Sequence, residues 1–355
     1  MKLNEICEVY SGYALKSFND VADGLPVVKI GNILTDGTLN LEECQYTTDI
    51  VNEKYYSNKG DIYIALSGAT TGKIGIMNTD DKYIINQRVG IVRQKSKDIP
   101  QEYIKYFLLR ETDRILQDAM GCAQPNISPK RIAEYIVPDI SKEDMRKVCE
   151  ILNKIKGIID SRKKEIIHFD ELVRGRFVEL FGDIISNEKG WETDIWSNVL
   201  KIVNGKNQKA VESEDGEYLI CGSGGAMGRA TEYLTNENSV IIGRKGSINK
   251  PLLMREKYWN VDTAFGIEPN TKYINVDYLY MFCVFFNFEK LNKAVTIPSL
   301  TKTDLLNIEM PIPNILLQNQ FADFVHQIDK SKLIVQKELD ETQLLFDSLM
   351  QEYFG

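Results

Sequence analysis

Two stretches of this sequence decide its organisation. The first runs from Val148 to Gly182 and reads VCEILNKIKGIIDSRKKEIIHFDELVRGRFVELFG. The second runs from Phe321 to Gly355 and reads FADFVHQIDKSKLIVQKELDETQLLFDSLMQEYFG. Both close on Phe-Gly, and the two closing pairs are 173 residues apart. The sequence therefore contains one pattern twice.

Each stretch carries a series of residues spaced alternately by four and three, and the two series are related by the same shift of 173. The first series is Val148, Leu152, Ile155, Ile159, Arg162, Ile166, Phe169, Val173, Arg176 and Leu180; the second is Phe321, Val325, Ile328, Lys332, Val335, Leu339, Thr342, Phe346, Leu349 and Tyr353. Such spacing puts the residues on one side of a helix, as in a coiled coil. We predict two long helices that pack on each other along this seam. Alternatively, each helix packs on its own globular part.

The duplication extends outward from the helices. Pro125 and Pro298 show the same shift, as do Pro138 and Pro311. The openings of the two globular parts match at a shift of 193, including Gly12 with Gly205, which makes the second part about 20 residues shorter. Both parts contain short β-rich runs, so each is predicted to be a mixed α/β domain.

Length and composition limit the class of protein. At 355 residues, with 43% hydrophobic and 26% charged residues, the chain suits two soluble globular domains. The N-terminus lacks the apolar core of a signal peptide, and Tyr278 to Phe288 is too short to span a bilayer, so it is expected to be a buried helix. Six cysteines without a CxxC pair indicate a reducing cytoplasm and argue against a zinc site.

The sequence offers little for catalysis. The loop from Ser67 to Ile74 is spaced too tightly for a P-loop and has Ile74 where a magnesium-binding hydroxyl belongs. The glycine-rich run from Cys221 to Gly228 lacks a dinucleotide-binding pattern. With only His168 and His326 available, neither a metal site nor a histidine-based triad is predicted.

A different chemistry recurs in both globular parts. Glycine-containing loops with hydroxyls and cations follow a β-run in each, and polar residues surround the paired prolines. Glycines let backbone amides approach an anion, while amides and guanidinium groups suit the edges of adenine and guanine. The net charge of −8 is unusual for a DNA-binding protein, but the cations gather in these loops. The candidate DNA contacts are Ser67, Thr70, Thr71, Lys73, Asn86, Gln87, Arg88, Gln124, Asn126, Ser128, Lys130, Ser223, Arg229, Arg244, Lys245, Ser247, Asn249, Lys250, Ser299, Thr301 and Lys302.

The order of these pieces resembles that of the specificity subunits of type I restriction-modification systems. The matching pieces are Gly60 to Ile62 leading into Ser67 to Lys73, Asn86-Gln87, Gln124 to Ser128, and Ile136 to Pro138 entering a helix. The second half repeats them loosely through Gly243 to Gly246, Ile297 to Thr301 and Met310 to Pro313, and it lacks a clear Ser-Gly-Ala-Thr loop.

The resemblance implies an α+β chain of two target-recognition domains separated by two long helices that form an antiparallel coiled coil. We expect a first recognition domain over residues 1–140, a central helix over 141–185, a second recognition domain over 186–314 and a final helix over 315–355. Head 1 denotes residues 1–140, and head 2 denotes residues 186–314.

The resemblance also implies function. Each head would read one half of a split, asymmetric target in double-stranded DNA. The helices would set the gap and dock two methyltransferase subunits, which methylate adenine at N6 and connect to restriction subunits. The chain itself would be non-catalytic, cytoplasmic and free of membrane contact. It would bind no cofactor, whereas the partner subunits would use S-adenosylmethionine, ATP and magnesium.

Two other classes stay open from the residues alone. One is a coiled-coil scaffold whose globular domains bind peptides. The other is a complete enzyme, such as a fused methyltransferase or nuclease, although the sequence lacks an Asn-Pro-Pro-Tyr/Phe methylation motif and a credible cluster of metal-binding acids.

Overall fold

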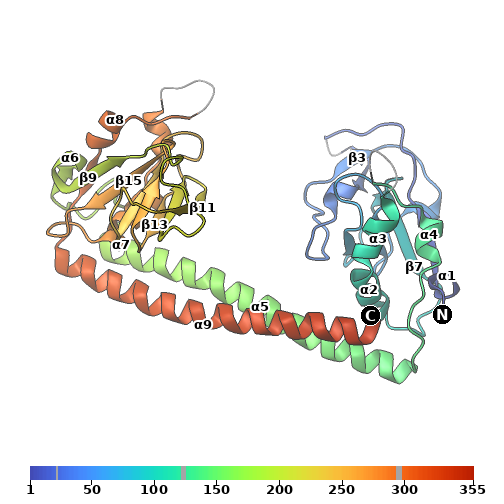
Figure 1. The fold of residues 1–355 in the computed structure, drawn as a ribbon. Helices are drawn as coiled ribbons and strands as arrows, with labels where there is room; N and C mark the ends of the chain where they lie inside the picture. The colour runs from blue at the N-terminus through green and yellow to red at the C-terminus, as the bar shows by residue number, and fades with distance from the viewer. Residues whose placement is uncertain (21–22, 121–124, 293–297) are drawn as a thin grey trace. The chain divides into compact units, whose positions relative to one another are not determined.

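The computed structural model describes residues 1–20, 23–120, 125–292 and 298–355 and combines helices with strands (Figure 1). It divides into two compact units. The first unit contains residues 1–161 and 339–355, and the second contains residues 162–338. Each unit therefore holds one head together with parts of both long helices.

Head 1 is built from short elements. In chain order they are α1 (Leu3–Ile6), β1 (Cys7–Ser11), β2 (Leu25–Val28), η1 (Ile30–Asn32), β3 (Gln45–Thr47), η2 (Glu53–Tyr55), β4 (Ile62–Ala65), β5 (Ile74–Ile76), β6 (Ile84–Ile85), β7 (Val89–Gln94), α2 (Gln101–Arg110), α3 (Thr112–Ala119) and α4 (Pro129–Ala133).

Head 2 follows a similar plan. Its elements are β8 (Thr193–Ile195), α6 (Trp196–Val199), β9 (Leu200–Asn204), β10 (Tyr218–Gly222), β11 (Gly225–Ala230), β12 (Ser239–Gly243), β13 (Leu252–Met254), β14 (Tyr258–Asn260), β15 (Ala264–Pro269), α7 (Val276–Phe285), η3 (Phe288–Leu291), α8 (Lys302–Leu306) and β16 (Glu309–Pro311). The predicted buried helix within Tyr278 to Phe288 corresponds to most of α7, whose residues 276–279 and 281–283 are buried. No helix in the described ranges is both long and apolar enough to cross a membrane.

The two heads share one sheet topology. Head 1 has a four-stranded sheet in the order β1-β7-β4-β5, and head 2 has the same arrangement in β9-β15-β12-β13, antiparallel throughout. Each head adds a three-stranded sheet, β3-β2-β6 or β11-β10-β14, with one antiparallel and one parallel pairing. The duplication inferred from the sequence is thus confirmed at the level of strand order.

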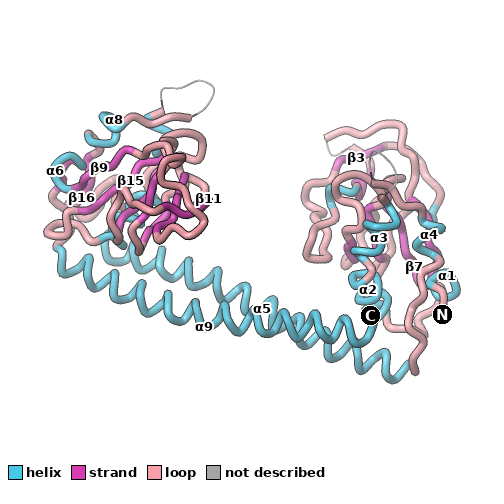
Figure 2. The backbone as a smooth tube through the Cα atoms, in the orientation of Figure 1, coloured by secondary structure: helices cyan, strands magenta, loops and turns pink. Residues whose placement is uncertain are grey.

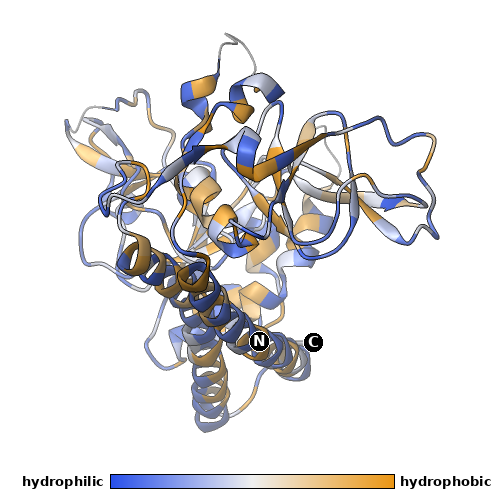
Figure 3. Ribbon diagram, turned by 90° about the vertical axis from the view of Figure 1, so that its left-hand side faces the viewer, coloured by the Kyte–Doolittle hydropathy of each residue, from blue (hydrophilic) through white to orange (hydrophobic). Residues whose placement is uncertain are grey.

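The two predicted long helices are α5 (Lys142–Phe181) and α9 (Ile315–Phe354), each of 40 residues. Ser141 caps α5, since the Asp144 amide donates to its hydroxyl at 3.1 Å and the hydroxyl donates to the Asp144 carboxylate at 2.6 Å. Gly182 follows α5 with φ at +75°, a conformation that glycine adopts readily. Polar and apolar residues alternate along both helices (Figure 3).

The helices pack together along the predicted seam, and all twenty of its residues are buried or half-buried. Figure 2 shows the two helices side by side. Within the second unit two polar residues of the seam form ion pairs with the facing helix. Arg162 pairs with Glu338 at 2.6 Å, and Lys332 pairs with Asp170 at 2.6 Å. From the first of these pairs to the second, the residue number rises along α5 and falls along α9. The two helices therefore pack antiparallel.

Both readings of the seam hold at once, because the helices also complete the cores of the heads. In the first unit Val148, Leu152, Met350 and Phe354 lie in one apolar cluster with α2, β4 and α4. In the second unit Phe177, Phe181, Phe321 and Val325 lie in one cluster with β9, β15 and α7. The predicted boundaries between heads and helices stay predictions.

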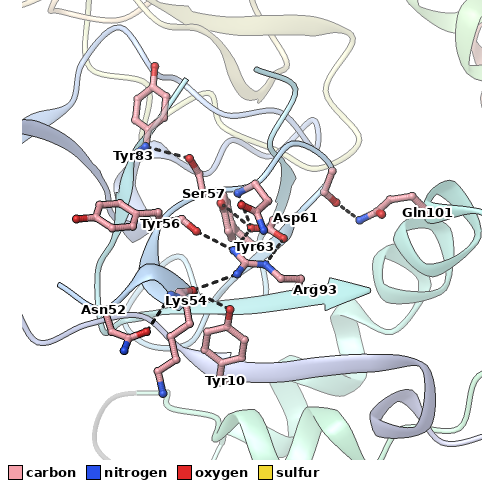
Figure 4. A network of polar contacts seen from close by, with 12 residues as sticks. Tyr10, Asn52, Lys54, Tyr56, Ser57, Asp61, Tyr63, Tyr83, Arg93 and Gln101 are labelled. Carbon is pink, nitrogen blue, oxygen red and sulfur yellow. Dashed lines mark hydrogen bonds and ion pairs between the residues drawn. The ribbon is translucent and has the colours of Figure 1, made fainter. Parts of the chain in front are cut away.

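A buried ion pair braces the four-stranded sheet of head 1 (Figure 4). The Arg93 guanidinium in β7 donates to both carboxylate oxygens of Asp61, at 2.9 and 2.6 Å, and to the carbonyl oxygen of Tyr56 at 2.7 Å. The Asp61 side chain is only 2% exposed. Its hydrogen bonds raise the pKa of Arg93. The pair ties the start of β4 to β7 and to the loop after η2.

Candidate nucleic-acid interface

The glycine-containing loop of head 1 is a tight turn between β4 and β5. Gly68 and Gly72 have φ values of +83° and +85°, where a side chain would be strained. The Thr71 hydroxyl donates to the carbonyl oxygen of Gly68 at 2.6 Å. Thr70 has a buried hydroxyl without a hydrogen-bond partner among the described residues, and Lys73 is half-buried. The loop is thus a folded support for its neighbours.

A second turn connects β6 to β7 and presents two of the predicted side chains. Asn86 is buried, and its side-chain oxygen accepts a hydrogen bond from the backbone amide of Arg88 at 3.1 Å. The Val89 amide closes the turn on the carbonyl oxygen of Asn86 at 2.9 Å. Gln87 and Arg88 are exposed. Asn86 therefore stiffens the turn that carries the amide and the guanidinium group.

A surface pocket of about 750 Å³ joins these segments. Its lining combines residues from β1, both turns and the start of α4: Ser11, Leu66, Ser67, Gln87, Arg88, Pro125, Asn126, Ile127, Ser128 and Pro129. Five predicted contacts thus come together, namely Ser67, Gln87, Arg88, Asn126 and Ser128. Hydroxyl, amide and guanidinium groups in one open pocket can donate to and accept from base edges or phosphates.

The remaining candidates of head 1 lie outside this pocket or outside the described residues. Lys130 is exposed in the first turn of α4, beyond Ser128, which caps that helix by accepting from the Arg131 amide. Gln124 lies outside the described residues. The neighbouring Arg131 is held by Asp118 at 3.0 Å, and its hydrogen bonds lower the pKa of that carboxyl.

The same junction recurs in head 2. In head 1 the Gly68 amide donates to the Pro125 carbonyl at 3.1 Å, and in head 2 the Gly246 amide donates to the Pro298 carbonyl at 3.0 Å. Lys245 forms an antiparallel β-bridge with Ser299, and Ser67 forms the corresponding β-bridge with Asn126. Thr301 caps α8 as Ser128 caps α4, in each case accepting from the amide three residues on. The predicted loop from Arg244 to Lys250 therefore corresponds in structure to the loop of head 1.

The head 2 candidates differ in how far they are engaged within the protein. Arg244, Lys245, Ser247 and Lys250 are exposed. Arg229 donates to the carbonyl oxygens of Gly216 and Glu217, Lys302 donates to that of Ile202 at 2.7 Å, and Asn249 bonds Asn287. Ser223 packs beside Gly243, where an added Cβ would lie 2.9 Å from the serine Cβ. The DNA contacts assigned to all these residues stay predictions.

Sequence reasoning did not name every residue of the head 1 pocket. Ser11 lines it as well. Ser11 lies directly before Gly12, which pairs with Gly205 in the sequence repeat, so the paired glycines were a signal that this corner of the head is built alike in both halves.

Comparison with known proteins adds to this geometry. A family model described as the type I restriction modification DNA specificity domain matches residues 1–168 and again residues 188–343. The MjaVIII type I specificity subunit of Methanocaldococcus jannaschii is 28% identical over 174 residues, which cover 46% of this chain and about two fifths (41%) of that relative. The putative MjaX specificity subunit of the same organism is 20% identical over 96% of this chain and 89% of its own.

Solved structures share the fold. The S subunit of a type I restriction-modification system from M. genitalium matches all of this chain and 95% of its own, with a TM-score of 0.60 and 16% identity. A chain from a study of complex assembly and conformational transition in the type I system matches with a TM-score of 0.59 and 15% identity, covering 100% of this chain and 96% of that one.

Two heads of one topology on a pair of long helices, with a specificity-domain match in each half, define the class of restriction-modification specificity proteins. Within that class, this chain belongs to the family of type I specificity subunits.

Proposed function

We propose that this chain reads a bipartite, asymmetric target in double-stranded DNA, one half-site with each head. The observation that supports it is the recurrence of one polar junction in both heads: the Gly68–Pro125 contact in head 1 and the Gly246–Pro298 contact in head 2. Each junction carries hydroxyl, amide or cationic side chains suited to base edges and phosphates. Because the side chains differ between heads, the two half-sites are expected to differ.

The long helices are proposed to dock two methyltransferase subunits, and restriction subunits through them. In support, both helices carry large apolar side chains away from the seam. Ile158 is 48% exposed on α5, and Leu333 and Leu344 are 73% and 70% exposed on α9. Such side chains offer apolar surface that another protein can cover. The related study of complex assembly supports a multi-subunit setting.

The chemistry is proposed to reside in the partner subunits. This chain would be non-catalytic and cytoplasmic and would bind no cofactor, while the partners would use S-adenosylmethionine for adenine-N6 methylation and ATP with magnesium for restriction. The support is the family to which the chain belongs, whose relatives are named as specificity subunits.

Methylation mapping tests the proposal. The chain would be expressed with its methyltransferase partners in a bacterial host that lacks adenine methylation, and modified adenines would be located by single-molecule sequencing. A split adenine motif is expected with the chain and none without it. Modification without a split motif, or a motif unaffected by removal of the chain, would contradict the reading role.

A further inference from the structure

The β6–β7 turn of head 1, which presents Gln87 and Arg88, has an unassigned counterpart in head 2. The Val89 amide donates to the Asn86 carbonyl at 2.9 Å, and the Ala264 amide donates to the Val261 carbonyl at 2.9 Å. In both heads this turn joins the parallel strand of the small sheet to the second strand of the large one. Asp262 therefore occupies the position of Gln87, and Thr263 occupies that of Arg88.

Contacts with the preceding strand fix both turns in the same way. The Gly12 amide donates to the Val89 carbonyl at 2.9 Å, and the Gly205 amide donates to the Ala264 carbonyl at 3.2 Å. A Cβ at Gly12 would lie 2.4 Å from the Asn86 carbonyl oxygen, and a Cβ at Gly205 would lie 1.8 Å from that of Val261. Only glycine permits such an approach. The first residue of each turn thus packs closely against the neighbouring strand, whereas the second is exposed to solvent.

Each head has an arginine beside this turn. The two heads share one backbone hydrogen bond here, and the arginine is the acceptor residue in head 1 but the donor residue in head 2. In head 1 the Leu66 amide donates to the carbonyl of Arg88 at 2.9 Å, so the arginine lies on the turn. In head 2 the Arg244 amide donates to the carbonyl of Thr263 at 2.7 Å, so the arginine lies on the neighbouring strand end. Its guanidinium reaches back to the Asp262 carbonyl oxygen at 3.4 Å. Both heads therefore place a guanidinium group beside the same turn.

The Asp262 side chain is available for a ligand. It is exposed, and its carboxylate has no hydrogen bond or ion pair with any residue in the described ranges. A carboxylate only accepts hydrogen bonds, and phosphate oxygens repel it. On a rigid turn beside an arginine, its suitable partner on DNA is an exocyclic amine. Cytosine N4 is the amine that Asp and Glu accept from in the major groove.

We propose that Asp262 and Arg244 form the base-reading site of head 2, with Asp262 selecting a cytosine at one position of the second half-site and Arg244 binding the adjacent phosphate or guanine. Thr263 adds a hydroxyl at the same turn. The assignment rests on the proposed reading function and gives it residues in a head where the sequence showed no counterpart of Gln87.

The test uses the full chain with its methyltransferase partners and the same methylation mapping. Asp262→Asn is compared with wild type, with Asp215→Asn as a control that removes one exposed acid elsewhere in head 2, and with Gln87→Ala in head 1. Asp262→Asn is expected to weaken selection for cytosine about tenfold or more at one position of the second half-site. It should leave the first half-site intact, whereas Gln87→Ala should change only the first.

Binding of the purified complex to duplexes that differ at that one base pair provides a second measurement, with thermal unfolding to establish that the variant is folded. A folded Asp262→Asn complex that keeps the wild-type motif overturns the assignment, and so does one that weakens all duplexes equally. Either result leaves the split motif of the wild type in place. Absence of that motif in the wild type would instead refute the proposed function itself.

Discussion

At the scale of single residues, the ion pair of Asp61 and Arg93 is a largely buried contact of head 1. The Asp61 side chain is 2% exposed and that of Arg93 is 18% exposed, and they meet at 2.6 Å. Removing one partner of a buried pair leaves the other charge uncompensated. By contrast, Lys59 and Asp80 pair at 2.9 Å with side chains 58% and 80% exposed, where water screens the attraction.

We expect Asp61→Ala to lower the free energy of unfolding of the first unit by about 3 to 5 kcal/mol. The matched variant Lys59→Ala should change it by less than about 1 kcal/mol. Urea denaturation combined with hydrogen exchange of β4 and β7 measures both. Similar values for the two variants would mean that the guanidinium finds another partner once the carboxylate is gone.

The sequence predicted part of the candidate site at this scale. Ser67, Gln87 and Arg88 were named from residue type, and they line one pocket. Asp262 was missed because insertions change the shift between counterparts, which is 193 at Gly12 and Gly205 but 173 at the paired prolines. Nor does a sequence reveal that the Arg229 guanidinium already bonds two backbone carbonyls.

At the scale of elements, α5 and α9 each serve both as half of a seam and as part of a head. Leu152 on α5 is fully buried in the core of the first unit, where it clusters with α2 and α4. The adjacent Ile151 is 39% exposed. Two neighbouring residues of α5 thus lie in different surroundings, one in the apolar core and the other partly exposed to solvent.

Leu152→Ala is expected to lower the free energy of unfolding of the first unit by about 2 to 5 kcal/mol, because it removes buried methyl groups and leaves a cavity. Ile151→Ala should cost less than about 1 kcal/mol, since the site is partly solvated and alanine favours helix. Thermal unfolding with hydrogen exchange along α2 separates the two. An equal loss of unfolding free energy in the two variants would indicate that Ile151 is as well covered by the protein as Leu152.

The helices were also the elements that the sequence predicted best. Steps of three and four over five heptads indicate a helix, and the two helices end at Phe181 and Phe354, each directly before a glycine. Whether the seam faces the other helix or the head could not be decided from the pattern, because both surroundings are apolar. Near the helix ends it faces both.

At the scale of the whole molecule, the two units differ in the number of chain segments that form them. The second unit is one continuous segment, residues 162–338, whereas the first combines residues 1–161 with residues 339–355. Met350 and Phe354 lie in the core of the first unit, and the Phe354 ring contacts that of Tyr103 with centroids 4.9 Å apart. Residues 339–355 therefore support head 1, although they follow head 2 in the sequence.

A chain truncated after Glu338 is expected to lose stability in head 1 while head 2 stays protected. Removing Met350 and Phe354 exposes apolar surface worth about 2 kcal/mol per side chain, which corresponds to exchange faster by about a hundredfold or more in α2 and β4. Hydrogen exchange with mass spectrometry resolves the two heads. Faster exchange in β12 and β15 of head 2, with head 1 unchanged, would contradict this division.

The shared core of Tyr103 and Phe354 also has a consequence for synthesis. Head 1 is synthesised before head 2. Its core nevertheless includes Phe354, which is added only after head 2 has been made. The core of the second unit, by contrast, is complete once residue 325 has been made. Domains generally fold as units during translation. The order of completion is therefore the reverse of the order of synthesis, because the core of head 1 is complete only after residues 350 and 354 have been made.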